Sequence, residues 1–115
     1  MKNTLLQIFL IYIVFTSCEV DCKELAEIMR KDQCHIIVKE LPNSDSAYDF
    51  EIIGKSIRTG NDTIYDEQNR WFCHYYKFIK PGDTVVKDQG ELLFQIHSKD
   101  TVMIFDWDCN GKIYK

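Results

Sequence analysis

The chain is 115 residues long, which is enough for one folded domain. Its 14 basic and 18 acidic side chains leave a formal net charge of −4, and this balance argues against a protein that coats nucleic acid. Hydrophobic residues at 45% and charged residues at 28% argue against wholesale disorder, while 13% aromatic residues favour β structure.

The first segment of the chain has the pattern of a secretory signal. A basic start at Lys2 is followed by an apolar run from Leu5 to Phe15, then by small residues, and acidic residues begin at Glu19. The apolar run is too short for a transmembrane helix, which needs about 20 apolar residues. The segment therefore predicts export.

The boundary Phe15-Thr16-Ser17-Cys18 resembles the lipobox of bacterial lipoproteins. The resemblance implies that residues 1–17 are a lipoprotein signal peptide and that Cys18 is acylated and becomes the first mature residue. It also implies a lipid anchor in the bacterial cell envelope, on the periplasmic or surface side. Two alternatives stay open: an ordinary signal peptide cut near Ser17, or a short uncleaved anchor. Residues 18–115 are expected to form a single small β-rich domain.

A short helix is predicted directly after this boundary. Asp21 is a suitable N-cap, with Glu24 three residues on as its reciprocal partner. The helix should end near residues 31–33, and its length is marginal for an isolated helix, so it must pack on something. Its apolar face consists of Cys22, Leu25, Ala26 and Met29.

Short strands separated by turns are predicted for the rest of the chain. Alternation marks strands over 34–38 and 48–52, and a phase slip at Ile53-Gly54 suggests a β-bulge. Residues 71–79 are apolar or aromatic on both faces and predict a central strand, or a strand with one face reserved for a partner. Further strands are expected at 84–87, 92–97 and 101–105, with a last hairpin at Asn110-Gly111. The predicted fold is α+β: the short N-terminal helix packed on an antiparallel meander that forms a sheet or a partly closed barrel.

The cysteines other than Cys18 are disulfide candidates, because an exported chain folds in an oxidising compartment. Cys22, Cys34, Cys73 and Cys109 allow three full connectivities, among which the sequence cannot choose. Buried free thiols are the alternative. No Cys-x-x-Cys or His-x-x-x-His spacing is present, so no metal site or other cofactor is expected.

No catalytic set is recognisable. His35, His74 and His97 fall in predicted strands without a nucleophile context. Asp106 and Asp108 share a strand face, but a β domain of this size leaves little room for a substrate cleft. The sequence therefore predicts a protein that is not an enzyme.

Binding to another protein is the better-supported hypothesis. Amphipathic aromatic residues are enriched at binding hot spots, and neighbouring acids would suit a basic partner. Alternatively, the tryptophans belong to the core and the acids are solvated turn residues. The expected function is a protein-binding or scaffold module, with an immunity protein against a toxic enzyme, or a small-ligand carrier with a pocket near His74 or His97, as alternatives. The candidate contact residues are Trp71, Tyr75, Tyr76, Trp107, Asp106 and Asp108.

Overall fold

Helix α2 (Cys22–Lys31) begins where the sequence predicts it. The computed structural model describes residues 21–42 and 46–115, so the lipobox-like segment and Cys18 lie outside the described residues. The Asp21 carboxylate accepts hydrogen bonds from the backbone N–H groups of Lys23 and Glu24, at 3.1 and 3.2 Å. The helix buries Cys22, Ala26 and Met29, which confirms the predicted apolar face.

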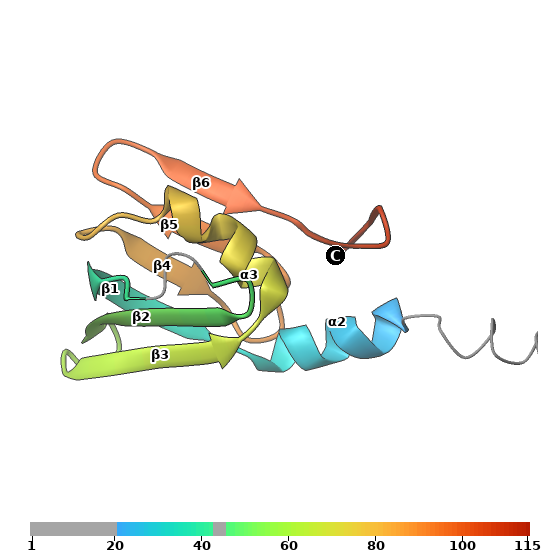
Figure 1. Cartoon of the computed structure of the whole chain (residues 1–115), viewed down its shortest axis with the longest axis horizontal. Helices are drawn as coiled ribbons and strands as arrows, with labels where there is room; N and C mark the ends of the chain where they lie inside the picture. Colours follow the sequence, from blue (N-terminus) through green and yellow to red (C-terminus); the bar gives the residue numbers. More distant parts are fainter. Residues whose placement is uncertain (1–20, 43–45) are drawn as a thin grey trace, which may run out of the picture.

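In the described part of the chain, six strands form one open antiparallel sheet in the order β3-β2-β1-β4-β5-β6 (Figure 1). This arrangement confirms the α+β class. Strand β4 pairs with β1, so two three-stranded meanders meet at the centre of the sheet. The bounds are β1 (Cys34–Glu40), β2 (Asp49–Ser56), β3 (Asp62–Gln68), β4 (Thr84–Lys87), β5 (Phe94–His97) and β6 (Val102–Phe105).

The chain ends in a separate hairpin of β7 (Trp107–Cys109) and β8 (Lys112–Tyr114). Asn110 and Gly111 connect the two strands with φ angles of 54° and 80°. Both values are positive, as a tight hairpin turn of this kind requires, and asparagine followed by glycine tolerates them best. The predicted hairpin is confirmed.

The pairing of β1 with β2 is irregular close to the predicted bulge. Val38 pairs with Gly54 and Glu40 pairs with Ile53, so the extra residue is Lys39 on β1 and not a residue of β2. Gly54 keeps the alternation of β2 and faces the core, as Phe50 and Ile52 do. A Cβ at this position would lie 2.0 Å from the Ile37 carbonyl oxygen, so only glycine lets the two backbones approach this closely.

The predicted strand over 71–79 is wrong. These residues form helix α3 (Arg70–Tyr75) and a 3₁₀ turn, η1 (Tyr76–Phe78). The Asn69 side chain caps α3 by accepting a hydrogen bond from the N–H of Phe72 at 3.1 Å. The run is apolar on both sides because α3 is contacted from two sides. Its large aromatic residues form two pairs, and the members of each pair are four residues apart in the sequence. Phe72 and Tyr76 belong to the buried core, while Trp71 and Tyr75 contact the segment after β6.

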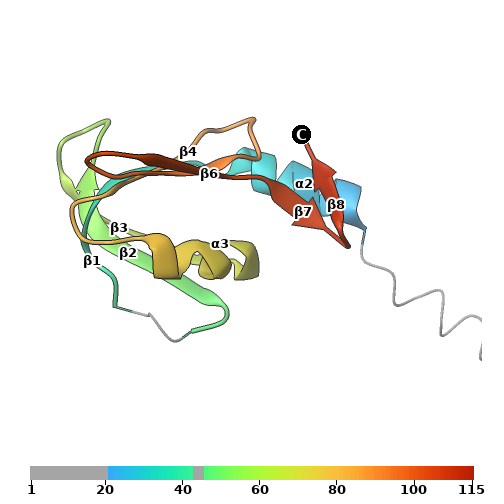
Figure 2. The same cartoon turned by 90° about the horizontal axis from the view of Figure 1, so that it is seen from above.

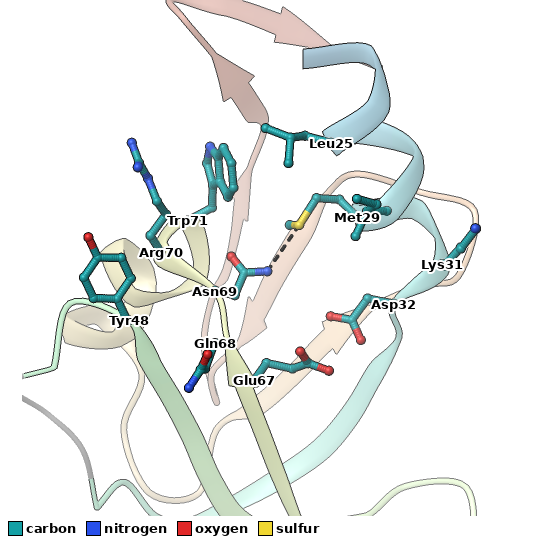
Figure 3. A pocket seen from close by; sticks show the side chains of 11 residues that line it. Leu25, Met29, Lys31, Asp32, Tyr48, Glu67, Gln68, Asn69, Arg70 and Trp71 are labelled. Carbon is teal, nitrogen blue, oxygen red and sulfur yellow. Dashed lines mark hydrogen bonds between the residues drawn. The ribbon is translucent and has the colours of Figure 1, made fainter. Parts of the chain in front are cut away.

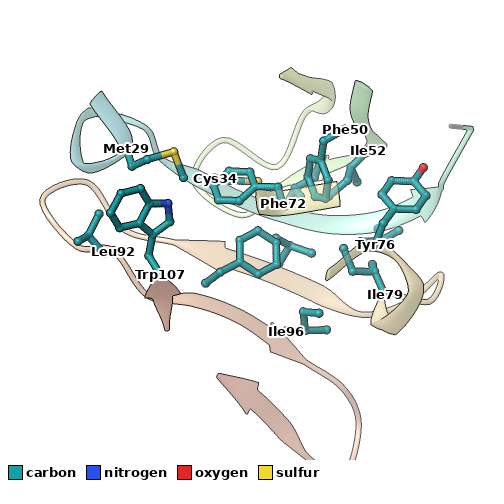
Figure 4. Close-up of a cluster of buried hydrophobic side chains, with 14 of the residues drawn as sticks. Met29, Cys34, Phe50, Ile52, Phe72, Tyr76, Ile79, Leu92, Ile96 and Trp107 are labelled. Atoms are coloured by element: carbon teal, nitrogen blue, oxygen red, sulfur yellow. The ribbon is translucent and has the colours of Figure 1, made fainter. Parts of the chain in front are cut away.

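Helix α3 covers one face of the sheet, and α2 runs past the end of the sheet beside the β7–β8 hairpin (Figure 2). Phe50 lies in the core between sheet and helix, with edge-on ring contacts to Tyr65, Phe72, Tyr76 and Phe94 at centroid distances of 5.5–6.0 Å. Figure 4 shows Phe50, Phe72 and Tyr76 among the buried side chains. No described helix covers the other face. Its exposed aliphatic side chains include Ile37, Ile64, Val102 and Ile104.

Candidate functional site

Five of the six predicted contact residues come together where α3 meets the segment after β6. The indole N–H of Trp71 donates to the carbonyl oxygen of Asp108 at 2.8 Å, and the Tyr75 hydroxyl donates to that of Asp106 at 3.2 Å. The rings of Trp71 and Trp107 lie 5.2 Å apart. Burial, and then the Asp108 and Asp106 carboxylates, raise the pKa of Tyr75 to about 12. The aromatic residues therefore hold this segment against the helix.

Two of the predicted contact residues are buried and cannot reach a partner. Trp107 is 1% exposed and Tyr76 is 6% exposed, because both rings are part of the core. The Tyr76 hydroxyl also donates to the Glu51 carbonyl oxygen at 3.0 Å. Asp106 and Asp108 are exposed, and neither makes an ion pair with a described residue. The two carboxylates and the half-buried Trp71, rather than Trp107 and Tyr76, thus remain open to binding.

The neighbouring edge strand carries exposed apolar groups that the sequence analysis did not single out. On the outer face of the sheet, Val102 is 48% exposed and Ile104 is 59% exposed. On the inner face Phe105 stacks against Tyr75 and Phe78, with centroids 4.5 and 5.4 Å away, and Phe78 is partly exposed. We call these groups and the two flanking acids the β6 surface: Phe78, Val102, Ile104, Phe105, Asp100 and Asp106.

The two edges of the sheet differ in charge. Strand β3 carries Asp62, Asp66 and Glu67, and Asp62 forms an ion pair with Lys39 at 2.8 Å. Strand β6 has the sequence Val-Met-Ile-Phe, without a charge, a proline or a glycine. Charged side chains on an edge strand discourage pairing with another chain, so β3 is protected and β6 is not. The uncharged run between Asp100 and Asp106 is visible in the sequence, but it does not show that this strand is an edge.

Open hollows lie around Arg70, the first residue of α3. One, of about 450 Å³, lies between α2 and the end of β3, with Leu25 and Met29 on one side and Tyr48, Arg70 and Trp71 on the other (Figure 3). A second hollow of similar volume adjoins it and includes His74. The Arg70 guanidinium lies 5.7 Å from the Trp71 ring centroid. The carrier hypothesis expected a pocket near His74, and His74 lines the second of these hollows.

A buried polar cluster joins the end of α2 to the sheet. The Lys87 ammonium, on a side chain that is fully buried, donates to the carbonyl oxygens of Asp32 and Asp88 at 2.8 and 2.9 Å. The Tyr65 hydroxyl donates to the Asp32 carboxylate. Cys34 pairs with Lys87 across the strands and is buried, and this burial raises the pKa of its thiol. A thiol kept protonated is a poor nucleophile.

We expect stability to fall as the pH rises above about 9. Burial raises the pKa values of Cys34, Tyr65 and Tyr75, so the folded chain keeps protons that the unfolded chain releases. The stability that these groups contribute is therefore complete near neutral pH and is lost at alkaline pH. Lys87 has the opposite effect on the pH dependence of stability, because burial lowers its pKa and the folded chain releases its proton before the unfolded chain does.

Urea unfolding near pH 7 and near pH 10 measures this loss. Tyr65→Phe removes one of the responsible groups and should make the alkaline loss smaller. A chain that is equally stable, or more stable, near pH 10 would contradict the expectation.

One disulfide joins the two ends of the described domain. Cys22 at the start of α2 is bonded to Cys109 in β7, with the Cα atoms 5.8 Å apart. The other two candidates, Cys34 and Cys73, are free thiols. The four candidate cysteines therefore form one disulfide and not two. The described residues contain no group of three or more histidine, cysteine or acidic side chains placed to hold a metal ion.

Comparison with protein-family models, curated proteins and solved structures gave no match for this chain. Among residues 21–42 and 46–115, no helix is long and apolar enough to cross a membrane.

Proposed function

We propose that this protein is a small lipoprotein of the bacterial cell envelope that binds a basic protein and is not an enzyme. The lipobox-like sequence at Cys18 and the Cys22–Cys109 disulfide support export, since disulfides persist in oxidising compartments. The β6 surface supports binding, and it is the observation that carries the proposal.

The chemistry of the β6 surface defines the partner. Exposed Val102 and Ile104 offer an apolar centre, and Asp100 and Asp106 stand at its two ends, where neither forms an ion pair with a described residue. The chain as a whole has a net charge of −4. A partner that places cations around a small apolar patch would gain from complementary charge on both sides of that patch.

The anchor is tested by changing Cys18. We expect the intact mass of the membrane-extracted protein to equal that of residues 18–115 plus acyl groups. Cys18→Ser should abolish the acyl mass and release the protein from the membrane fraction, because a protein without acyl chains has no lipid anchor. Cys73→Ser is the matched control, since it makes the same substitution at a cysteine outside the lipobox-like segment. A full-length mass without acyl groups would refute the lipoprotein assignment.

The binding function is tested by chemical cross-linking in the cells that make the protein. We expect a basic envelope or extracellular protein to be cross-linked to the native chain, and much less of it to the double variant Asp100→Lys/Asp106→Lys. If that partner is an enzyme that attacks the envelope, and the native chain inhibits it, the function is that of an immunity protein. A cross-linked partner that is acidic, or that the double variant retains fully, would contradict the proposal.

A further inference from the structure

The geometry of the β6 surface points to strand addition: an extended basic segment of the partner pairs with β6 and becomes a seventh strand of the sheet. This inference rests on the proposed function and specifies how the partner is held. It follows from the backbone of β6, from the side chains on its two faces and from the charges at its two ends.

The backbone of β6 offers unused hydrogen-bonding groups. The strand pairs with β5 on one side only, from Val102 opposite His97 to Phe105 opposite Phe94. In an antiparallel edge strand, alternate residues direct their N–H and C=O groups away from the sheet. No described strand pairs with this edge. An extended segment can therefore bond to it directly, as in other cases of strand addition.

The side chains of β6 determine what the added strand carries. Val102 and Ile104 are exposed on the outer face, whereas Met103 and Phe105 pack against the core. Residues of the added strand that lie on the outer face would contact the two aliphatic side chains, so we expect β-branched or other apolar residues there. At the two ends, the carboxylates of Asp100 and Asp106 favour lysine or arginine.

A second copy of this chain fits the edge less well than a basic segment does. Antiparallel pairing of two β6 strands about Met103 would place Val102 opposite Ile104, which is favourable. The same register would place Asp100 opposite Asp106 at both ends, and like charges directly opposite each other are destabilising. The β3 edge is not an alternative, because its acidic side chains are spread along the whole strand.

The test uses the full chain, purified in detergent, and a labelled synthetic peptide, Arg-Lys-Val-Thr-Val-Thr-Val-Lys-Arg. We expect it to bind with a micromolar dissociation constant, and a version with glutamate in place of the basic residues to bind at least about tenfold more weakly. Two backbone-methylated peptides complete the set, one methylated on the valines and one on the threonines. Methylation of the residues whose N–H groups face β6 should cost at least about tenfold, and methylation of the other set should cost much less.

Two variants with matched exposure locate the site. Ile104→Asp on β6 should weaken binding at least about tenfold, whereas Ile64→Asp on β3 should change it less than about twofold. The two isoleucines are 59% and 61% exposed, so we expect the two substitutions to change the free energy of unfolding by similar amounts. Circular dichroism of both variants confirms that they are folded.

Several results would overturn strand addition. These are absence of binding at about millimolar peptide, equal effects of the two methylation patterns, a larger effect of Ile64→Asp, or a β6-dependent dimer without peptide. The proposed function fails separately: a basic partner cross-linked through a different surface would leave the function standing and refute strand addition. Peptide binding without any protein partner in cells would refute the function alone.

Discussion

Phe50→Ala is expected to lower the free energy of unfolding by about 3–5 kcal/mol. The Phe50 ring is fully buried and meets four other aromatic rings, from β3, α3, η1 and β5. Its removal would leave a cavity that this rigid ring cluster cannot close, so the lost transfer free energy and the cavity add together. The loss is a large part of the total stability of a domain of this size.

Equilibrium urea unfolding, followed by tryptophan fluorescence, measures the change. Phe50→Leu keeps most of the side-chain volume and should recover much of the loss. Ile104→Ala is the surface control and should change the free energy of unfolding by less than about 1 kcal/mol. If Phe50→Ala cost no more than Ile104→Ala, Phe50 would not be the centre of the core.

Removal of the disulfide should be the second-largest perturbation. The double variant Cys22→Ala/Cys109→Ala is expected to lose about 2–4 kcal/mol. The bond joins cysteines that are 87 residues apart, so it restricts almost the whole domain in the unfolded state. In the folded state it holds the first turn of α2 to β7, at a place where the sheet itself does not extend.

Unfolding with and without reductant separates the disulfide from the packing of the two side chains. Reductant should destabilise the native chain and leave the double variant unchanged. Cys73→Ala removes a half-buried free thiol and should cost less than about 1 kcal/mol. A native chain whose stability is insensitive to reductant would show that this bond contributes nothing.

Local patterns in the sequence were sufficient to predict those elements whose structure depends mainly on residues close together in the chain. The Asp21 cap and the spacing of Cys22, Ala26 and Met29 predicted α2, because capping and helical periodicity act within a few residues. Alternation predicted β1 and the inward side of β2, and Asn110-Gly111 predicted the last hairpin. Together these elements were enough for the α+β class.

Residues 70–78 show where local patterns were misleading. Aromatic residues favour strands on average, and the run is apolar on both sides, so it resembled a central strand. In the folded chain, the sheet and the segment after β6 contact two sides of α3, and these contacts outweigh intrinsic preference. The Asn69 cap and the spacing of four residues within the pairs Trp71/Tyr75 and Phe72/Tyr76 were the local signals of the helix.

The sequence by itself determined that this is a small acidic chain with a capped helix and several short strands, and it predicts a leader for export. Only the tertiary structure decided which cysteines pair, which tryptophan is buried and which strands form the edges. Each of these properties depends on residues far apart in the chain: Cys22 meets Cys109, and β6 becomes an edge because β4 returns to pair with β1. A window of neighbouring residues contains no information on such contacts, which is why the β6 surface emerged only from the folded chain.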